Sequence, residues 1–131
     1  MIDPNLPLID LHRHLEGCVR LETLLELGHQ HNLPMPAWTV EGLRPYVQVS
    51  GPQPGVMAFI SRFEWITKVM VDADACRRLA FENVQIASDE GIDYFELRFS
   101  PWFMAETHQL DPSSVVAAVV EGVQEGSQAF H

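Results

Sequence analysis

Two histidines one residue apart, His12 and His14, stand near the start of the chain, directly after the apolar run LPLIDL. Side chains at positions i and i+2 of a strand point to the same side, so both imidazole rings can reach one metal ion. Zinc takes imidazole nitrogen and carboxylate oxygen as ligands. The spacing therefore indicates two zinc ligands, although by itself it fits a pair of hydrogen-bonded core or loop histidines equally well.

The chain carries its own control for this motif. His29 and His31, in the stretch GHQHN, have the same spacing but fall at the end of a predicted helix. Residues two apart on a helix do not face each other, so this second pair indicates surface histidines. His14 and Glu16 also match the first half of the cytidine-deaminase-type zinc signature, but its Pro-Cys-x-x-Cys half is absent from the sequence.

Strands and helices predicted from the sequence must position these side chains. Residues 6–14 predict a buried strand, and Gly17 lets the backbone turn away after it. Residues 20–30 predict a helix, and an irregular connection with three prolines follows. A second helix is predicted after GPQPG from an apolar stripe with helical spacing, made of Val56, Phe59, Ile60, Phe63 and Met70.

The second half of the chain again combines a strand with helices. A helix capped by Asp72 or Asp74 is predicted to end at Gly91, and the stretch IDYFELRFSP then alternates as a strand does. Asp111-Pro112 opens a last helix. The order of strand, helices, strand and helix predicts an α/β fold with parallel strands, and residues 1–131 form one segment without separate domains. Two strands are too few for a covered sheet, so we expect the chain to be the first part of something larger.

Charge and composition exclude several classes of partner. The net charge is −10, from 18 acidic against 8 basic residues, which argues against nucleic acid and against an anionic membrane surface. No apolar run is long enough to span a bilayer, and the first residues show no signal peptide. Cys18 and Cys76 form no close pair, so we expect reduced thiols and a cytoplasmic protein.

Four segments together resemble the adenosine deaminase family of the amidohydrolase superfamily, above all its bacterial members: LPLIDLHRHLEG, FISRFEW, YFELRFSP and DPSSVVAAVVEGVQEGSQAF. The resemblance runs in order along essentially the whole chain. It implies the N-terminal part of a (β/α)8 TIM barrel, with strands 1 and 2 and their intervening helices, and a third strand that begins near residues 129–131. It also implies one Zn²⁺ ion and hydrolytic deamination of adenosine to inosine and ammonia, a reaction of purine salvage.

The resemblance assigns roles to individual residues. His12 and His14 match the first two zinc ligands, and Glu16 matches an acid that contacts the sugar side of the substrate. Most adenosine deaminases have aspartate at that position, whereas glutamate is familiar from related adenine deaminases. A helix that covers the substrate pocket is matched by Val56, Phe59, Ile60 and Phe63. We read Glu96 and Arg98, on one side of the second strand, as a buried ion pair or as support for the site.

The rest of the family's site is expected beyond residue 131: the third zinc histidine, the catalytic glutamate and an aspartate pair. No catalytic residue is therefore expected in this chain, and its zinc ligand set is incomplete, because an open zinc site needs three protein ligands. We predict that the chain alone does not deaminate adenosine. Two alternatives stay open: an adenine deaminase of the same family, and a truncated, non-catalytic fragment that associates through exposed strand edges.

Overall fold

The computed structural model describes residues 6–52 and 54–130, and its elements alternate as an α/β chain. In order they are β1 Ile9–His14, η1 Leu15–Gly17, α1 Leu21–Gln30, α2 Val40–Val47, α3 Val56–Ile60, η2 Ser61–Phe63, α4 Glu64–Lys68, α5 Ala73–Asp89, β2 Tyr94–Arg98, α6 Pro101–Glu106 and α7 Pro112–Phe130. The two strands pair in parallel, as predicted.

One irregularity interrupts this pairing. Asp10 lies opposite Phe95, and Arg13 lies opposite Leu97, so β1 advances three residues while β2 advances two. An extra residue in one strand of a pair is a β-bulge, which bends the strand and changes where its side chains point.

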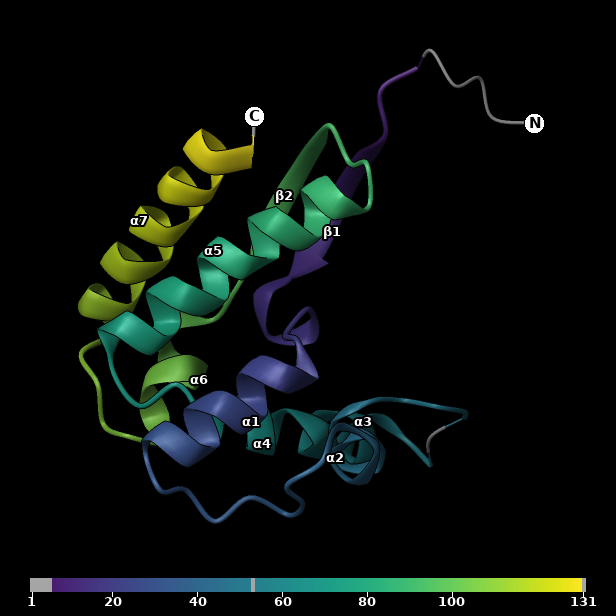
Figure 1. Cartoon of the computed structure of the whole chain (residues 1–131), viewed down its shortest axis with the longest axis vertical. Coiled ribbons are helices and arrows are strands. Elements are labelled where there is room, and N and C mark those ends of the chain that lie inside the picture. The colour runs from purple at the N-terminus through teal and green to yellow at the C-terminus, as the bar shows by residue number, and fades with distance from the viewer. Residues whose placement is uncertain (1–5, 53, 131) are drawn as a thin grey trace.

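The helices α5 and α7 lie side by side and cover one face of the two strands (Figure 1). Phe95 and Leu97 of β2 face this layer. The inward side chains of the layer are almost completely buried; they include Leu79, Val84, Val115 and Val119. Gly122 allows the close approach of the two helices, because a Cβ atom there would lie 2.2 Å from the carbonyl oxygen of Arg77.

The other face of the strands is bare among the described residues. Ile9 and Leu11 of β1 and Tyr94 of β2 are each about half exposed, so the prediction of a buried first strand is wrong for this chain. The reason is physical: a parallel strand is buried only when layers cover both faces of its sheet, and here one layer is present.

The connections gather beyond the C-terminal ends of the strands, where α1 to α4 and α6 lie (Figure 1). The helix α1 was predicted, but α2, capped by Thr39, and α6, capped by Ser100, were not. The predicted second helix is broken into α3, η2 and α4, and its apolar stripe does not form one buried face, since Val56 is 68% exposed and Met70 is buried.

The predicted starts of the two long helices are confirmed. The Asp72 carboxylate accepts a hydrogen bond from the Ala75 N–H at 2.8 Å, and the Asp111 carboxylate accepts one from the Ser114 N–H at 3.0 Å. The helix α7 stays helical to Phe130, where a third strand was expected to begin, and residue 131 lies outside the described part. Within the described residues, every helix is too short or too polar to cross a bilayer.

Candidate metal and substrate site

The two predicted metal ligands meet at the end of β1. The Nε2 atoms of His12 and His14 are 3.0 Å apart, and their ring centroids are 4.9 Å apart. Two nitrogens that bind one zinc ion at about 2.0–2.1 Å can be at most about 4.2 Å apart, so this pair fits a shared ion. The described residues contain no group of three histidine, cysteine or acidic side chains able to hold a metal.

Two oppositely charged side chains flank the histidines on β1. The His12 backbone N–H and the Arg13 side chain lower the pKa of Asp10, which keeps its carboxylate ionised. Burial lowers the pKa of Arg13, but hydrogen bonds to Glu90 and Asp10 outweigh it, so that pKa is raised overall. Burial also raises the pKa of the nearby Cys18 thiol, which keeps it protonated at neutral pH.

Glu16 is buried in η1, so it is not an exposed acid at a helix start. One of its carboxylate oxygens accepts a hydrogen bond from the Ser100 N–H at 3.2 Å, just after the end of β2. The hydroxyl of Ser100 accepts a hydrogen bond from the Phe103 N–H and caps α6. The acid that follows strand 1 is therefore tied to the residue that follows strand 2.

A cavity of about 390 Å³ opens beside this contact. It is lined by His14, Glu16, Ile60, Phe63, Arg98, Phe99, Ser100 and Phe103. Four of the predicted site residues thus line one cavity, and His12 joins them through its ring contact with His14. Val56 and Phe59 do not line it, although the Phe59 ring lies edge-on to Phe63 at 5.3 Å between centroids.

Sequence reasoning missed three residues that line this cavity: Phe99, Ser100 and Phe103. They follow the end of β2 just as Glu16 follows the end of β1. The carboxyl ends of parallel strands meet at one edge of a sheet, so residues that follow either strand end are site candidates. Applied to β2 as well as β1, this rule identifies the three residues from the sequence.

The prediction for Glu96 and Arg98 needs correction. Their side chains are 3.8 Å apart and about half exposed, so this ion pair is not buried. The two residues lie on the bare face of β2, and their contact is screened by solvent. Arg98 also lines the cavity that contains His14 and Glu16, so its role as support for the site stays a prediction.

Asn83 of α5 holds the turn that carries Glu16, and this role was not predicted from the sequence. Its side chain is fully buried, and its Nδ2 donates to the carbonyl oxygens of Leu15, Cys18 and Leu79 at 3.0–3.4 Å. Asn83 thereby attaches the turn that carries Glu16 to the packed helix layer.

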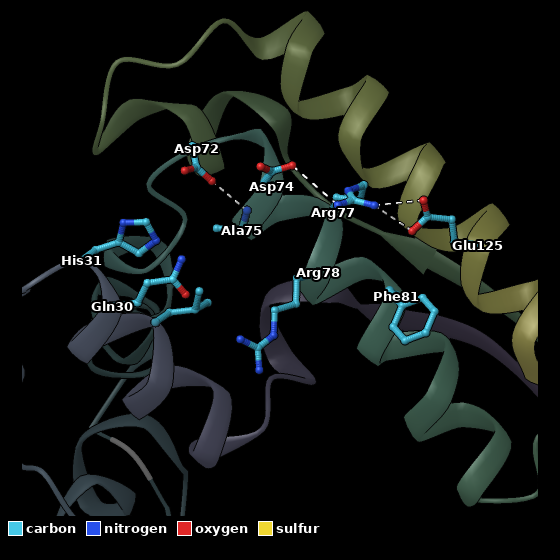
Figure 2. Close-up of a pocket in the computed structure, with 10 residues that line it drawn as sticks. Gln30, His31, Asp72, Asp74, Ala75, Arg77, Arg78, Phe81 and Glu125 are labelled. Carbon is cyan, nitrogen blue, oxygen red and sulfur yellow. Dashed lines mark hydrogen bonds and ion pairs between the residues drawn. The ribbon is translucent and has the colours of Figure 1, made fainter.

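A second cavity, of about 440 Å³, lies between α1, α5 and α7 (Figure 2). Figure 2 shows Arg77 between Asp74 and Glu125, with contacts of 3.6 Å and 2.9 Å. Arg78, at the same cavity, pairs with Glu26 and Glu82. These arginines are already neutralised by acidic partners, and none of the predicted site residues lines this cavity, so it is not the candidate site.

Known proteins resemble this chain along nearly its whole length. The sequence profile described as adenosine deaminase matches residues 7–131. An adenosine deaminase from Shewanella loihica is 52% identical over 130 residues, which are 99% of this chain and 39% of that protein. The chain therefore spans about two fifths of the length of this curated relative.

Solved structures show the same fold. An amidohydrolase from Burkholderia ambifaria, determined with bound Zn, superposes with a TM-score of 0.74 at 21% identity and covers 95% of this chain and 33% of that one. An adenine deaminase from Arthrobacter aurescens superposes with a TM-score of 0.79 at 17% identity over 95% and 36% of the two chains. The predicted partial barrel is confirmed, and the chain belongs to the adenosine deaminase family.

Proposed function

We propose that the complete protein catalyses the zinc-dependent hydrolytic deamination of adenosine to inosine and ammonia, in purine salvage. One observation carries this proposal: two histidine Nε2 atoms stand 3.0 Å apart at the end of β1, beside the cavity that contains Glu16. A zinc ion held there by His12 and His14 would lower the pKa of a bound water and so supply a nucleophile at neutral pH. Its remaining ligands and the catalytic residues belong to the part of the barrel outside this chain.

The described side chains have three roles in this proposal. His12 and His14 hold the metal, and Glu16, fixed by the Ser100 N–H, orients the substrate. Ile60 and Phe63 exclude water from the purine, since apolar walls strengthen the few polar contacts inside a site. Val56 and Phe59 begin the same helical segment, and we assign them to the outer part of this apolar cover.

An adenine deaminase is the second candidate, and Glu16 is the observation that favours it. The resemblance places an aspartate here in most adenosine deaminases and a glutamate in adenine deaminases. The glutamate side chain is one methylene longer, and in this chain it reaches the backbone of the neighbouring strand end. Activity of the complete protein on both substrates decides between them.

We also propose that this chain alone is inactive and that it associates with other chains through its exposed strand edges. A cytoplasmic location is favoured by its two free thiols, and the net charge of −10 disfavours nucleic acid and anionic membranes as partners.

The inactivity of the chain alone is tested directly. Purified chain with zinc is expected to leave adenosine absorbance unchanged. Turnover above a zinc-only control would contradict this.

The main proposal is tested with a chimaera in which residues 1–131 replace the matching segment of the Shewanella loihica protein. We expect conversion of adenosine to inosine, at least about a hundredfold slower after His12→Ala or His14→Ala because the metal is lost. His29→Ala is the matched control, since it removes an imidazole from the other His-x-His pair and is expected to leave the rate unchanged. A folded chimaera that is inactive on both adenosine and adenine would overturn the proposal.

A further inference from the structure

The bulge in β1 decides which way the histidines point. In a regular strand Asp10, His12 and His14 would all lie on one face, because alternate side chains share a face. The register instead places Asp10 opposite Phe95 and Arg13 opposite Leu97, on the face covered by the helices. His14 therefore points to the bare face, and His12 joins it there, with its ring against that of His14.

A buried guanidinium holds this bulge from the helix side. Arg13 is 7% exposed, its Nε donates to the Asp10 carboxylate at 3.0 Å, and its Nη2 donates to Glu90 at the end of α5. The other oxygen of Asp10 accepts a hydrogen bond from the His12 N–H at 3.1 Å. A continuous chain of contacts thus runs from α5 through Arg13 and Asp10 to the backbone of His12.

Stability alone does not account for this arrangement. The Nη1 atom of Arg13 is buried and has no hydrogen-bond partner in the described part of the chain. An unsatisfied buried donor is unfavourable, and the Glu90 carboxylate is 52% exposed, so solvent screens part of its attraction to Arg13. What the ion pair adds is a fixed geometry, because the planar guanidinium holds Asp10 and Glu90 in set directions.

We propose that Arg13 is a positioning residue for the metal site: anchored by Glu90, it holds Asp10 against the His12 amide and so keeps the His12 ring beside His14. The contacts concern this chain alone, and only their purpose, to present two ligands to one ion, rests on the proposed function. Neither the alternation of the strand nor the His-x-His spacing reveals this role.

The test is NMR spectroscopy of the 131-residue chain without metal. Two quantities are measured: hydrogen exchange of the His12 amide, and the nuclear Overhauser effect between the His12 and His14 rings. Arg13→Met is expected to speed exchange of this amide by about tenfold or more and to abolish the ring–ring effect. Glu90→Ala, which alters an exposed carboxylate and does not endanger folding, is expected to move both in the same direction by a smaller amount.

Arg78→Met is the matched control, since Arg78 also bridges two acidic side chains but lies away from β1. It is expected to change neither quantity. Unchanged His12 exchange and an unchanged ring–ring effect in folded Arg13→Met, or in Glu90→Ala if Arg13→Met does not fold, would overturn the proposal. A zinc titration separates the two claims: a wild-type chain whose His12 and His14 rings do not respond to zinc counts against the zinc site, while the metal-free measurements still decide the role of Arg13.

Discussion

The helix layer of α5 and α7 and the strand pair of β1 and β2 differ in how completely their side chains are buried. In α5 and α7 the inward side chains are almost completely buried, and glycines bring the helices into close contact. In β1 and β2 one face is bare, and large apolar side chains such as Leu11 and Tyr94 are more than half exposed. The histidine pair belongs to the less packed of the two regions.

This difference shows how a site can be ordered without a core around it. Packing holds side chains in the helix layer, whereas around His12 the described contacts are mainly polar and come from Asp10, Arg13 and Glu90. Substitutions in the two regions should therefore differ in kind: those in the layer change stability, and those in the strands change geometry with little change in stability.

The largest effect is expected for Leu79→Ala, in the centre of the helix layer. Leu79 is 1% exposed, and truncation of such a side chain leaves a cavity that lowers the free energy of unfolding by about 2–5 kcal/mol. Leu11→Ala removes the same atoms from a side chain that is 58% exposed and is expected to change the free energy of unfolding by less than about 0.5 kcal/mol. Urea unfolding measures both, and equal losses would show that the strand face is covered in solution.

Gly122→Ala tests the close approach of the helices. Its new methyl group would overlap the carbonyl oxygen of Arg77, so α5 and α7 must separate, which lowers the free energy of unfolding by about 1–3 kcal/mol. Gly51→Ala is the control, because a Cβ atom there meets nothing within 4 Å. Equal urea midpoints for the two variants would contradict the tight helix contact.

Asn83→Ala disturbs the connection between the two regions. Three carbonyl oxygens lose a donor, those of Leu15, Cys18 and Leu79, and we expect a loss of about 1–2 kcal/mol in the free energy of unfolding. Hydrogen exchange should become faster in residues 15–18 and stay unchanged in α7. Ser88→Ala, at a half-buried position of the same helix, should leave the turn protected; a similar response to both changes would remove Asn83 from this role.

The last effect is a dependence on pH that is confined to the alkaline range. Burial raises the pKa of Cys76 from 9.0 to about 11, so between these values the thiol ionises in the unfolded chain before it does so in the folded one. The unfolded state then binds fewer protons, and the free energy of unfolding falls as the pH rises from about 9 to about 11. Urea unfolding across this range should fall less steeply for Cys76→Ala, whereas parallel curves would show that Cys76 is not shielded from solvent.

The sequence is informative where the local pattern and the fold agree. The alternation of Phe95 and Leu97 with exposed neighbours predicts β2, and the capping aspartates Asp72 and Asp111 predict the starts of two helices. These signals depend on backbone geometry and adjacent side chains, so they can be recognised without knowledge of tertiary contacts.

Other features depend on partners distant in sequence. The bulge between Asp10 and Arg13 appears only in the pairing with β2, and Arg13 contacts Glu90, 77 residues away. Glu16 contacts Ser100, 84 residues away. The short helices α2 and α6 offer too few turns for an apolar period to show. The resemblance to a family could point to His12, His14 and Glu16, but it could not reveal the contacts that hold them.

The bare strand face also has a calorimetric consequence. The heat capacity change of unfolding arises mainly from apolar surface that the folded state hides and the unfolded state exposes. Side chains such as Ile9, Leu11 and Tyr94 are already about half exposed before unfolding, so they add less to this change than buried side chains do. The chain should therefore show a smaller heat capacity increment per residue than the usual value of about 12–15 cal/mol/K, and a correspondingly flatter curve of stability against temperature.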